Sequence, residues 1–307
     1  GDWSSDVCSS DLEFTDATTQ HERQVAAEVR ESRLLSQVRA LLQLSQPGFS
    51  LDFRELASRA ADLTLGYFQS DRIRVESKSD ASPVTQADRE AERLIRDTVT
   101  ASFPGDGFIG EEEGTSADTT GFRWVIDPID GTVSFAAGVP LYGSLIGIER
   151  TLPDGSRRVV AGVASMPALR ERVWAVEGGG AWWERAGRPT VPARVCEPRP
   201  LSDSIACTTG SEYYRRTNRM HVLARLEETC GRMRGWSDCY SLVLLATGRC
   251  QVAIDPMMNP WDCGPFPVII AEAGGVFSSW KGEPGIHGGD SVACHPSMHA
   301  EMLRLIG

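Results

Sequence analysis

Carboxylates stand at the ends of apolar stretches in this sequence. Glu111 follows Gly-Phe-Ile-Gly, Asp127 and Asp130 follow Trp-Val-Ile, and Asp262 opens a later apolar segment. An acidic side chain at the end of a buried strand costs free energy unless a positive group meets it. Carboxylate oxygens are the ligands that hard divalent cations prefer, so the pattern indicates a metal site, with Mg²⁺ as the expected cation.

The segment 127–130 reads Asp-Pro-Ile-Asp. Its proline fixes its own φ and restricts the residue before it, which can turn both carboxylates and the Ile129 carbonyl toward one point. If Gly131 and Thr132 open a helix, their N–H groups form an anion site at its positive end. Asp-Pro and Asp-Gly are also ordinary turn dipeptides, so the string alone is compatible with a plain turn. A metal site beside a phosphate cradle would imply metal-assisted phosphate chemistry.

Regular elements must position these acids. An amphipathic helix is predicted over 51–68, and a polar loop with a proline over 76–85. Thr85 can cap the next helix, with Asp88 at its third position, close to a capping box. Short strands are predicted before each acidic group, and one helix over 260–275 has prolines in its first turn and a Gly-Gly end.

Composition restricts the function classes. The chain has 307 residues, 41% hydrophobic and 24% charged, and a net charge of −11. This charge argues against a nucleic-acid backbone or an anionic membrane as the main partner. No apolar run reaches the roughly 18 residues of a membrane span. The 8 cysteines form no C-x-x-C pair, so we expect reduced thiols and a cytoplasmic location.

The beginning of the chain differs from the rest. Asp2 to Leu12 match, residue for residue, the translation of a common short-read sequencing adapter, so we expect residues 1–12 to be a sequencing artefact. The chain stays acidic without them. Residues 13–48 carry apolar side chains near helical spacing and end in Pro-Gly, which predicts a helical extension. Whether this extension is native or was joined by misassembly stays open.

The motifs D-P-x-D-G-T, G-E-E before it and W-D…E-A-G-G after it resemble the inositol monophosphatase superfamily, a group of Mg²⁺-dependent phosphomonoesterases. The resemblance covers roughly residues 51–307. It implies an α+β and α/β fold, a layered α-β-α-β-α sandwich of the inositol monophosphatase and fructose-1,6-bisphosphatase type. We expect an α+β part over 49–193 with the metal motifs and an α/β part over 194–307 that completes the site. Two or three Mg²⁺ ions and a homodimer are also expected from the family.

The resemblance assigns roles to single residues. The implied metal ligands act through side chains, and in one case through a carbonyl: Glu111, Asp127, Asp130, Asp262 and the Ile129 carbonyl. Thr132 and Glu111 would align the attacking water, and the Gly131 and Thr132 amides would hold phosphate. Asp88 matches an acid near a weaker metal site, or is simply a helix N-terminal charge. Lys78 matches a lysine on the family's mobile loop, or is a solvated surface charge.

The stretch "SDCYSLVLLATGRCQVAIDPMMNPWD" is similar to the histidinol-phosphate phosphatases of that superfamily. Their substrate carries an ammonium and a titratable imidazole. Asp238, Asp255 and Asn259 offer partners for both groups, although the two acids could equally cap turns at strand ends. We therefore expect hydrolysis of L-histidinol phosphate to L-histidinol and phosphate, a step of histidine biosynthesis. The alternatives are an inositol-1-phosphate phosphatase or a broad sugar- or nucleotide-phosphate phosphatase.

A more remote alternative is an inactive binding protein, which would need a lost ligand, and none of the implied ligands is missing. The chain departs from the family at one point. Residues 263–267 read Cys-Gly-Pro-Phe-Pro, where the family has small and aliphatic residues. This difference leaves the packing behind Asp262 as a question for the structure.

Overall fold

The computed structural model of the chain describes residues 53–71, 75–77, 83–236 and 238–307. The predicted segments 1–12 and 13–48, together with Lys78, lie outside these residues. From Leu51 to Gly307 the chain forms one compact unit. Among the described residues, no helix combines the length and the apolar character needed to cross a membrane.

A mixed sheet of eight strands forms the first part of the fold, in the order β10-β9-β8-β7-β6-β5-β3-β4. Strands β3 and β5 run parallel, and the other neighbours are antiparallel. The short strands β1 (Val75–Ser77) and β2 (Pro83–Thr85) pair separately. The strands of the large sheet are β3 (Gly107–Gly110), β4 (Gly114–Ser116), β5 (Phe122–Asp130), β6 (Gly143–Thr151), β7 (Arg157–Met166), β8 (Glu171–Val176), β9 (Ala181–Arg185) and β10 (Val191–Pro192).

A second sheet of five strands has the order β12-β11-β13-β15-β14. Strand β11 pairs in parallel with β12 and β13, whereas β15 is antiparallel to β13 and β14. Its strands are β11 (Ile205–Cys207), β12 (Arg232–Arg234), β13 (Val252–Asp255), β14 (Val276–Ser278) and β15 (Ser291–Cys294). The eight-stranded sheet and the β1–β2 pair fall in the predicted part 49–193, and the five-stranded sheet falls in the part 194–307. The boundary at residue 193 stays a prediction.

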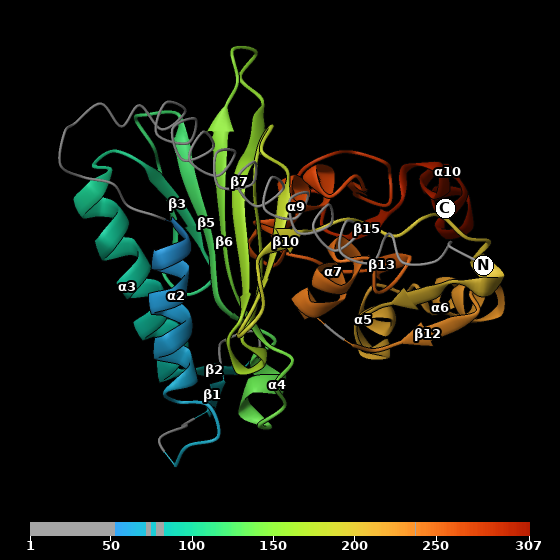
Figure 1. Cartoon of the computed structure of the whole chain (residues 1–307), viewed down its shortest axis with the longest axis horizontal. Helices are drawn as coiled ribbons and strands as arrows, with labels where there is room; N and C mark the ends of the chain where they lie inside the picture. The colour runs from blue at the N-terminus through green and yellow to red at the C-terminus, as the bar shows by residue number, and fades with distance from the viewer. Residues whose placement is uncertain (1–52, 72–74, 78–82, 237) are drawn as a thin grey trace, which may run out of the picture. The chain divides into compact units, whose positions relative to one another are not determined.

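Helices cover both sheets and fill the space between them (Figure 1). The outer pair on the large sheet is α2 (Phe53–Leu65) and α3 (Gln86–Ser102). Between the sheets lie α7 (Asp238–Ala246), α8 (Pro260–Cys263) and α9 (Phe266–Glu272). The remaining helices are α4 (Thr132–Ala136) after β5 and, on the far side of the small sheet, α5 (Ser211–Arg216), α6 (Met220–Thr229) and α10 (Pro296–Ile306). Two single 3₁₀ turns occur at Pro167–Leu169 and Leu201–Asp203.

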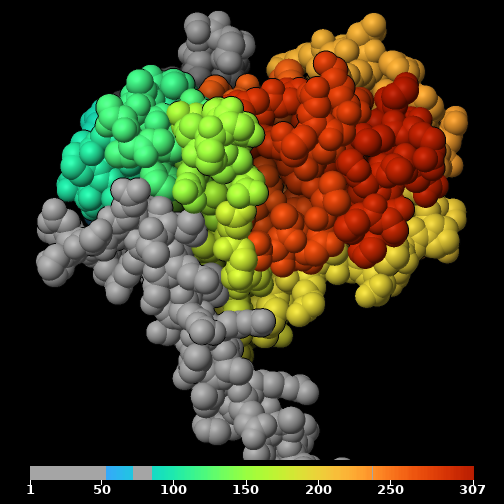
Figure 2. Space-filling model, turned by 90° about the horizontal axis from the view of Figure 1, so that it is seen from above, coloured from blue at the N-terminus to red at the C-terminus, as the bar shows by residue number. Residues whose placement is uncertain are grey.

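The predicted α-β-α-β-α sandwich is therefore confirmed. Figure 2 shows the molecule from above, with the teal-to-green part of the chain against the orange-to-red part. The two larger apolar clusters of the described residues pack its layers together. One packs α7 and α9 between the sheets, and the other packs α6 and α10 against the small sheet. The predicted apolar side of α2 is buried at Phe53, Leu56, Ala57, Ala60 and Ala61.

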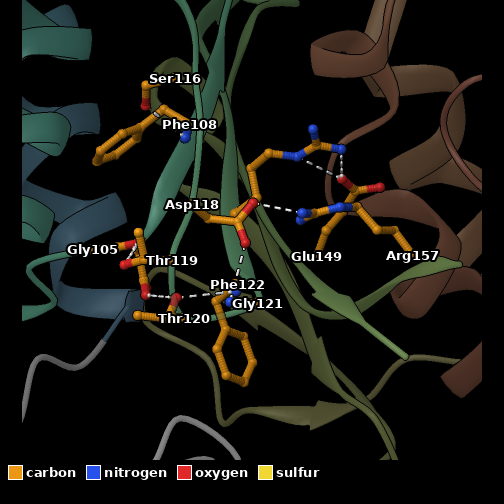
Figure 3. A network of polar contacts seen from close by, with 12 residues as sticks. Gly105, Phe108, Ser116, Asp118, Thr119, Thr120, Gly121, Phe122, Glu149 and Arg157 are labelled. Atoms are coloured by element: carbon orange, nitrogen blue, oxygen red, sulfur yellow. Dashed lines mark hydrogen bonds and ion pairs between the residues drawn. The ribbon is translucent and has the colours of Figure 1, made fainter. Parts of the chain in front are cut away.

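A polar network fixes the start of β5, at the end of the strand opposite to its aspartates (Figure 3). Asp118 bonds the Arg157 guanidinium at 2.5 Å and accepts from the Gly121 amide at 3.1 Å. Arg123 on β5 reaches Glu149 on β6 at 2.7 Å, and the buried Glu149 carboxylate also contacts a histidine. These bonds hold the register of β5 at its start. The position of its carboxyl end, which carries the aspartates, is thereby defined as well.

The helix predicted over 260–275 is in fact two helices, so this prediction was wrong in detail. Gly264 and Pro265 lie between α8 and α9. Pro265 and Pro267 lack the amide hydrogens that a continuous helix would use, which favours the break. The junction lies against the backbone of the large sheet, because a Cβ on Gly147 would stand 2.2 Å from the Gly264 carbonyl oxygen and one on Gly162 would stand 2.6 Å from Pro265 Cα. Two glycines, one on β6 and one on β7, thus make room for the unusual sequence after Asp262.

We expect Gly147→Ala to destabilise the protein by about 1–3 kcal/mol or more, because the added methyl group meets backbone rather than a flexible side chain. Urea unfolding in buffer with EDTA measures this change. Gly235→Ala is the matched control, since a Cβ there meets no atom of the described residues within 4 Å. Equal stability of the two variants would show that the α8–α9 junction does not need this close approach.

Candidate active site

The first pair of acids is positioned by the parallel register of two strands. Gly110 of β3 lies opposite Ile126 of β5, so the residues that follow, Glu111 and Asp127, emerge side by side. The Glu111 amide continues this ladder by donating to the Ile126 carbonyl at 3.3 Å. Strand pairing therefore places two carboxylates at one edge of the sheet.

The ladder between β5 and β6 is irregular from Asp127 to Asp130, which pairs with Gly143. Within this bulge the Ile129 amide donates to Asp127 Oδ1 at 3.1 Å, and the Thr132 hydroxyl donates to the Ile129 carbonyl at 3.1 Å. The bulge thus brings both aspartates of the Asp-Pro-Ile-Asp segment to the same edge, as a bulge does when it redirects side chains.

Two further acids lie at helix N-termini, where each accepts a hydrogen bond from the backbone amide of the cap residue. Asp262 is the third residue of α8, and its Oδ2 accepts from the Asn259 amide at 2.7 Å. Asp88 is the third residue of α3, and its Oδ2 accepts from the Thr85 amide at 2.8 Å. Both are capping boxes, as predicted for Thr85. Asp88 Oδ1 is buried and has no hydrogen-bond partner among the described residues.

Three of these carboxylates converge. Asp127, Asp130 and Asp262 offer oxygens that all lie within 4.8 Å of one another, with the first two acids buried and the third half-buried. Burial raises the pKa of Asp127 and Asp130 well above its ordinary value, and neighbouring carboxylates add to the shift. Of the ion pairs within the described part of the chain, none includes these three acids. Oxygen-only ligands without a cationic partner fit a hard divalent ion.

Electrostatics connects the other predicted acids to this centre. Burial is the largest cause that raises the pKa of Asp127 and Asp262, and the charge of Glu111 adds to both shifts. Burial, and then the Glu111 charge, raises the pKa of Asp88 to about 6. Together with its unpartnered oxygen, this coupling indicates that Asp88 faces the same centre. The reading of Asp88 as only a helix N-terminal charge therefore leaves half of its carboxylate unexplained.

The start of α7 closes the site from the second part of the chain. The Cys239 amide donates to Asp130 Oδ2 at 2.6 Å across 109 positions of sequence. Asp238, at φ 48°, lies so near Gly131 that a Cβ there would stand 2.9 Å from Asp238 Oδ2. Gly131 itself has φ 84°, which favours glycine. The sequence did not predict the role of Cys239, because a backbone donor leaves no side-chain signal.

The predicted substrate contacts reach the same neighbourhood. Asp255 ends β13, is buried, and accepts from the Thr209 amide at 2.7 Å. Burial, opposed by this bond and aided by the charges of Asp238 and Asp262, raises the pKa of Asp255 to about 7. The side-chain amide of Asn259 also donates to Asp262 Oδ2, at 3.2 Å, so this side chain already serves the helix cap. Asp238 and Asp255 therefore add negative charge beside the cluster of Asp127, Asp130 and Asp262.

Comparison with known proteins agrees with the fold. The model of the inositol monophosphatase family matches residues 50–306. A histidinol-phosphatase from Chlorobaculum parvum is 41% identical over 82% of this chain and 94% of its own length. An inositol-1-monophosphatase from Rhizobium meliloti is 32% identical over 76% of this chain and 85% of its own length. The solved Thermotoga maritima IMPase superposes with a TM-score of 0.70 at 27% identity, covering 83% of this chain and 95% of that one.

These relatives and the acidic centre define a phosphoric monoester hydrolase, as the sequence predicted. The chain belongs to the inositol monophosphatase family. The family is metal-dependent, and the converging carboxylates are a centre of the kind that such chemistry needs.

The metal-free protein should lose stability as the pH rises. Asp262 has a pKa of about 7 in the folded protein and 3.8 ordinarily, so between these values the folded form holds a proton that the unfolded chain has released. Mg²⁺ replaces that proton, because only the ionised carboxylates bind it. We expect Mg²⁺ to raise the melting temperature more at about pH 8 than at about pH 5. Scanning calorimetry with Mg²⁺ or EDTA, with NaCl at matched ionic strength as the control, tests this; an equal gain at both pH values contradicts it.

Proposed function

We propose that this phosphatase is a Mg²⁺-dependent histidinol-phosphate phosphatase. The observation that supports this substrate is the pair Asp238 and Asp255 beside the acidic cluster. Besides burial, the charge of Asp238 raises the pKa of both Asp130 and Asp255. Asp238 and Asp255 therefore belong to one electrostatic group with the cluster. Phosphate alone gives no reason for extra negative charge near its site, whereas a cationic alcohol portion does. The most similar relative reported above is also named a histidinol-phosphatase.

The proposed metal ligands are oxygens of β5, of α8 and of the residue that follows β3. They are Glu111, Asp127, Asp130, Asp262 and the Ile129 carbonyl. Asp88, with its unpartnered buried oxygen, would face a further ion, so we expect two or three in all. Bound Mg²⁺ supplies positive charge that offsets the phosphate and lowers the pKa of water.

The neighbouring residues would orient the reactants. The Thr132 hydroxyl donates its hydrogen to the Ile129 carbonyl. The lone pairs of the Thr132 oxygen can therefore accept a hydrogen bond from a water molecule. Glu111 would accept the second hydrogen of this water and so align its oxygen with phosphorus. The Gly131 and Thr132 amides would hold phosphate oxygens. Attack on phosphorus opposite the ester oxygen would form a new P–O bond as the ester P–O bond breaks. The proton that the water loses would balance the proton that the departing alcohol oxygen takes up.

Asp238 and Asp255 would bind the ammonium and imidazole of the substrate. Burial raises the pKa of Asp255 to about 7, and a bound ammonium would lower it again by favouring the ionised carboxylate. A substrate contact of Asn259 stays a prediction, since its amide already bonds Asp262. A mobile-loop role of Lys78, a cytoplasmic location and a homodimer likewise stay predictions from the family.

The alternative within the family is an inositol-1-phosphate phosphatase or a broad-specificity phosphatase. The inositol-1-monophosphatase relative, at 32% identity, keeps this alternative in view. Its substrate is a neutral polyol phosphate, for which Asp238 and Asp255 would serve only as hydroxyl acceptors. The two readings therefore differ in what these acids do, while the metal chemistry is common to both.

Phosphate release at saturating Mg²⁺ from L-histidinol phosphate and, in parallel, from inositol 1-phosphate separates the two readings. We expect kcat/KM to be at least about 100-fold higher for histidinol phosphate, which corresponds to about 2.7 kcal/mol of discrimination. Equal values, or a preference for inositol phosphate, would overturn the substrate and leave the phosphatase activity intact.

The variant Asp255→Asn should remove much of this preference, because an amide cannot pair with a cation. It should raise KM for histidinol phosphate far more than KM for inositol 1-phosphate. A loss that is equal for both substrates would instead assign Asp255 to the support of the site.

A further inference from the structure

A row of polar residues on α3 faces the loop that carries Glu111. Asp88, Glu92 and Arg96 follow one another at four-residue spacing, so they share one face of the helix. Glu92 is fully buried, and its side chain is 0% exposed. A carboxylate is rarely buried so completely without hydrogen-bond donors, and its donors show what it holds.

Those donors are backbone amides of the turn after β3. Glu92 Oε2 accepts from the Glu112 amide at 2.8 Å, and Oε1 accepts from the Glu113 amide at 3.1 Å. These are the two residues that follow Glu111. On the other side of Glu111, a Cβ on Gly110 would stand 2.0 Å from Glu92 Oε1, so only glycine lets the carboxylate lie under the strand end.

Arg96 completes the support of this turn. Its Nε lies 2.7 Å from Glu92 Oε1, and its Nη2 donates to the Gly114 carbonyl at 2.5 Å. The guanidinium also lies over the Phe108 ring at 4.8 Å. The helix therefore bonds the turn at residues 112, 113 and 114, while the Glu111 amide is fixed to β5 by its bond to Ile126.

We propose that Glu92 is a positioning residue, which fixes the Glu111 backbone so that the Glu111 carboxylate points at the metal centre. The inference rests on the proposed metal-binding role of Glu111. Residues that orient a metal ligand contribute to metal affinity without touching the metal. One helix would then serve the site twice, directly through Asp88 and indirectly through Glu92.

The variant Glu92→Gln tests this role, because an amide has the same shape but offers one acceptor oxygen where two are used. We expect the Mg²⁺ concentration that gives half of the gain in melting temperature, measured without substrate, to rise about 10-fold to 100-fold. At saturating Mg²⁺ the kcat should return close to that of the unchanged protein. A purely structural role would lower the EDTA melting temperature and the kcat at every Mg²⁺ concentration, and would leave this midpoint unmoved.

Glu113→Gln is the matched control. It removes one negative charge, as Glu92→Gln does, but from the turn itself, where the Glu113 carboxylate lies 3.7 Å from the Arg93 and Arg96 side chains. Both amide bonds to Glu92 stay in place. Its Mg²⁺ midpoint should stay within about twofold of the unchanged protein, as for an exposed ion pair. A shift as large as that of Glu92→Gln would mean that charge, not positioning, sets the affinity, and would overturn the proposal.

Arg96→Gln keeps the proposal testable if Glu92→Gln fails to fold. It leaves the two amide bonds to Glu92 and removes the contact to Gly114, so we expect a smaller rise of the Mg²⁺ midpoint. An unchanged midpoint would overturn the proposal that α3 positions Glu111 through this turn. A protein whose melting temperature ignores Mg²⁺ would contradict the proposed metal centre itself. If the unchanged protein responds and Glu92→Gln responds identically, only the role of Glu92 fails.

Discussion

Repulsion among buried carboxylates at the carboxyl end of β5 is the constraint on which the rest of this structure depends. Burial raises the pKa of Asp127, Asp130 and Asp262, and the charges of neighbouring carboxylates raise it further. The ion pairs of the described part of the chain include none of the three. Holding them together takes a parallel strand pair, a bulge, a capping box and the Cys239 amide. A fold that uses four separate devices to concentrate negative charge is arranged for a bound cation rather than for its own stability.

The capping boxes show how helix geometry serves this purpose. In both α3 and α8, the acid at the third position gives one oxygen to the amide of the cap residue. The bond fixes the side chain and leaves its other oxygen for the centre. A feature that ordinarily stabilises a helix start therefore also orients Asp88 and Asp262, and the motif at Thr85 was visible in the sequence because it is local.

The sequence predicted what local pattern and family resemblance can carry. The layered fold was predicted from motifs, and the structure brings the predicted acids Asp127, Asp130 and Asp262 together. The sequence did not predict the hydrogen bond from the Cys239 amide to Asp130 or the one from the Glu112 amide to Glu92. These bonds join residues 109 and about 20 positions apart, and in each the donor is a backbone amide, which leaves no side-chain signal. It also did not predict the break between α8 and α9, whose prolines were visible but whose partners, two sheet glycines, could be found only in three dimensions.

The most direct test of the account is the unfolding free energy of Asp127→Asn at about pH 8, measured in EDTA and again in Mg²⁺. If the cluster is held together against its own charge, the neutral amide should stabilise the metal-free protein by about 1 kcal/mol or more and should abolish most of the gain from Mg²⁺. If the variant is less stable than the unchanged protein in EDTA and still gains fully from Mg²⁺, the carboxylates are not a cation site.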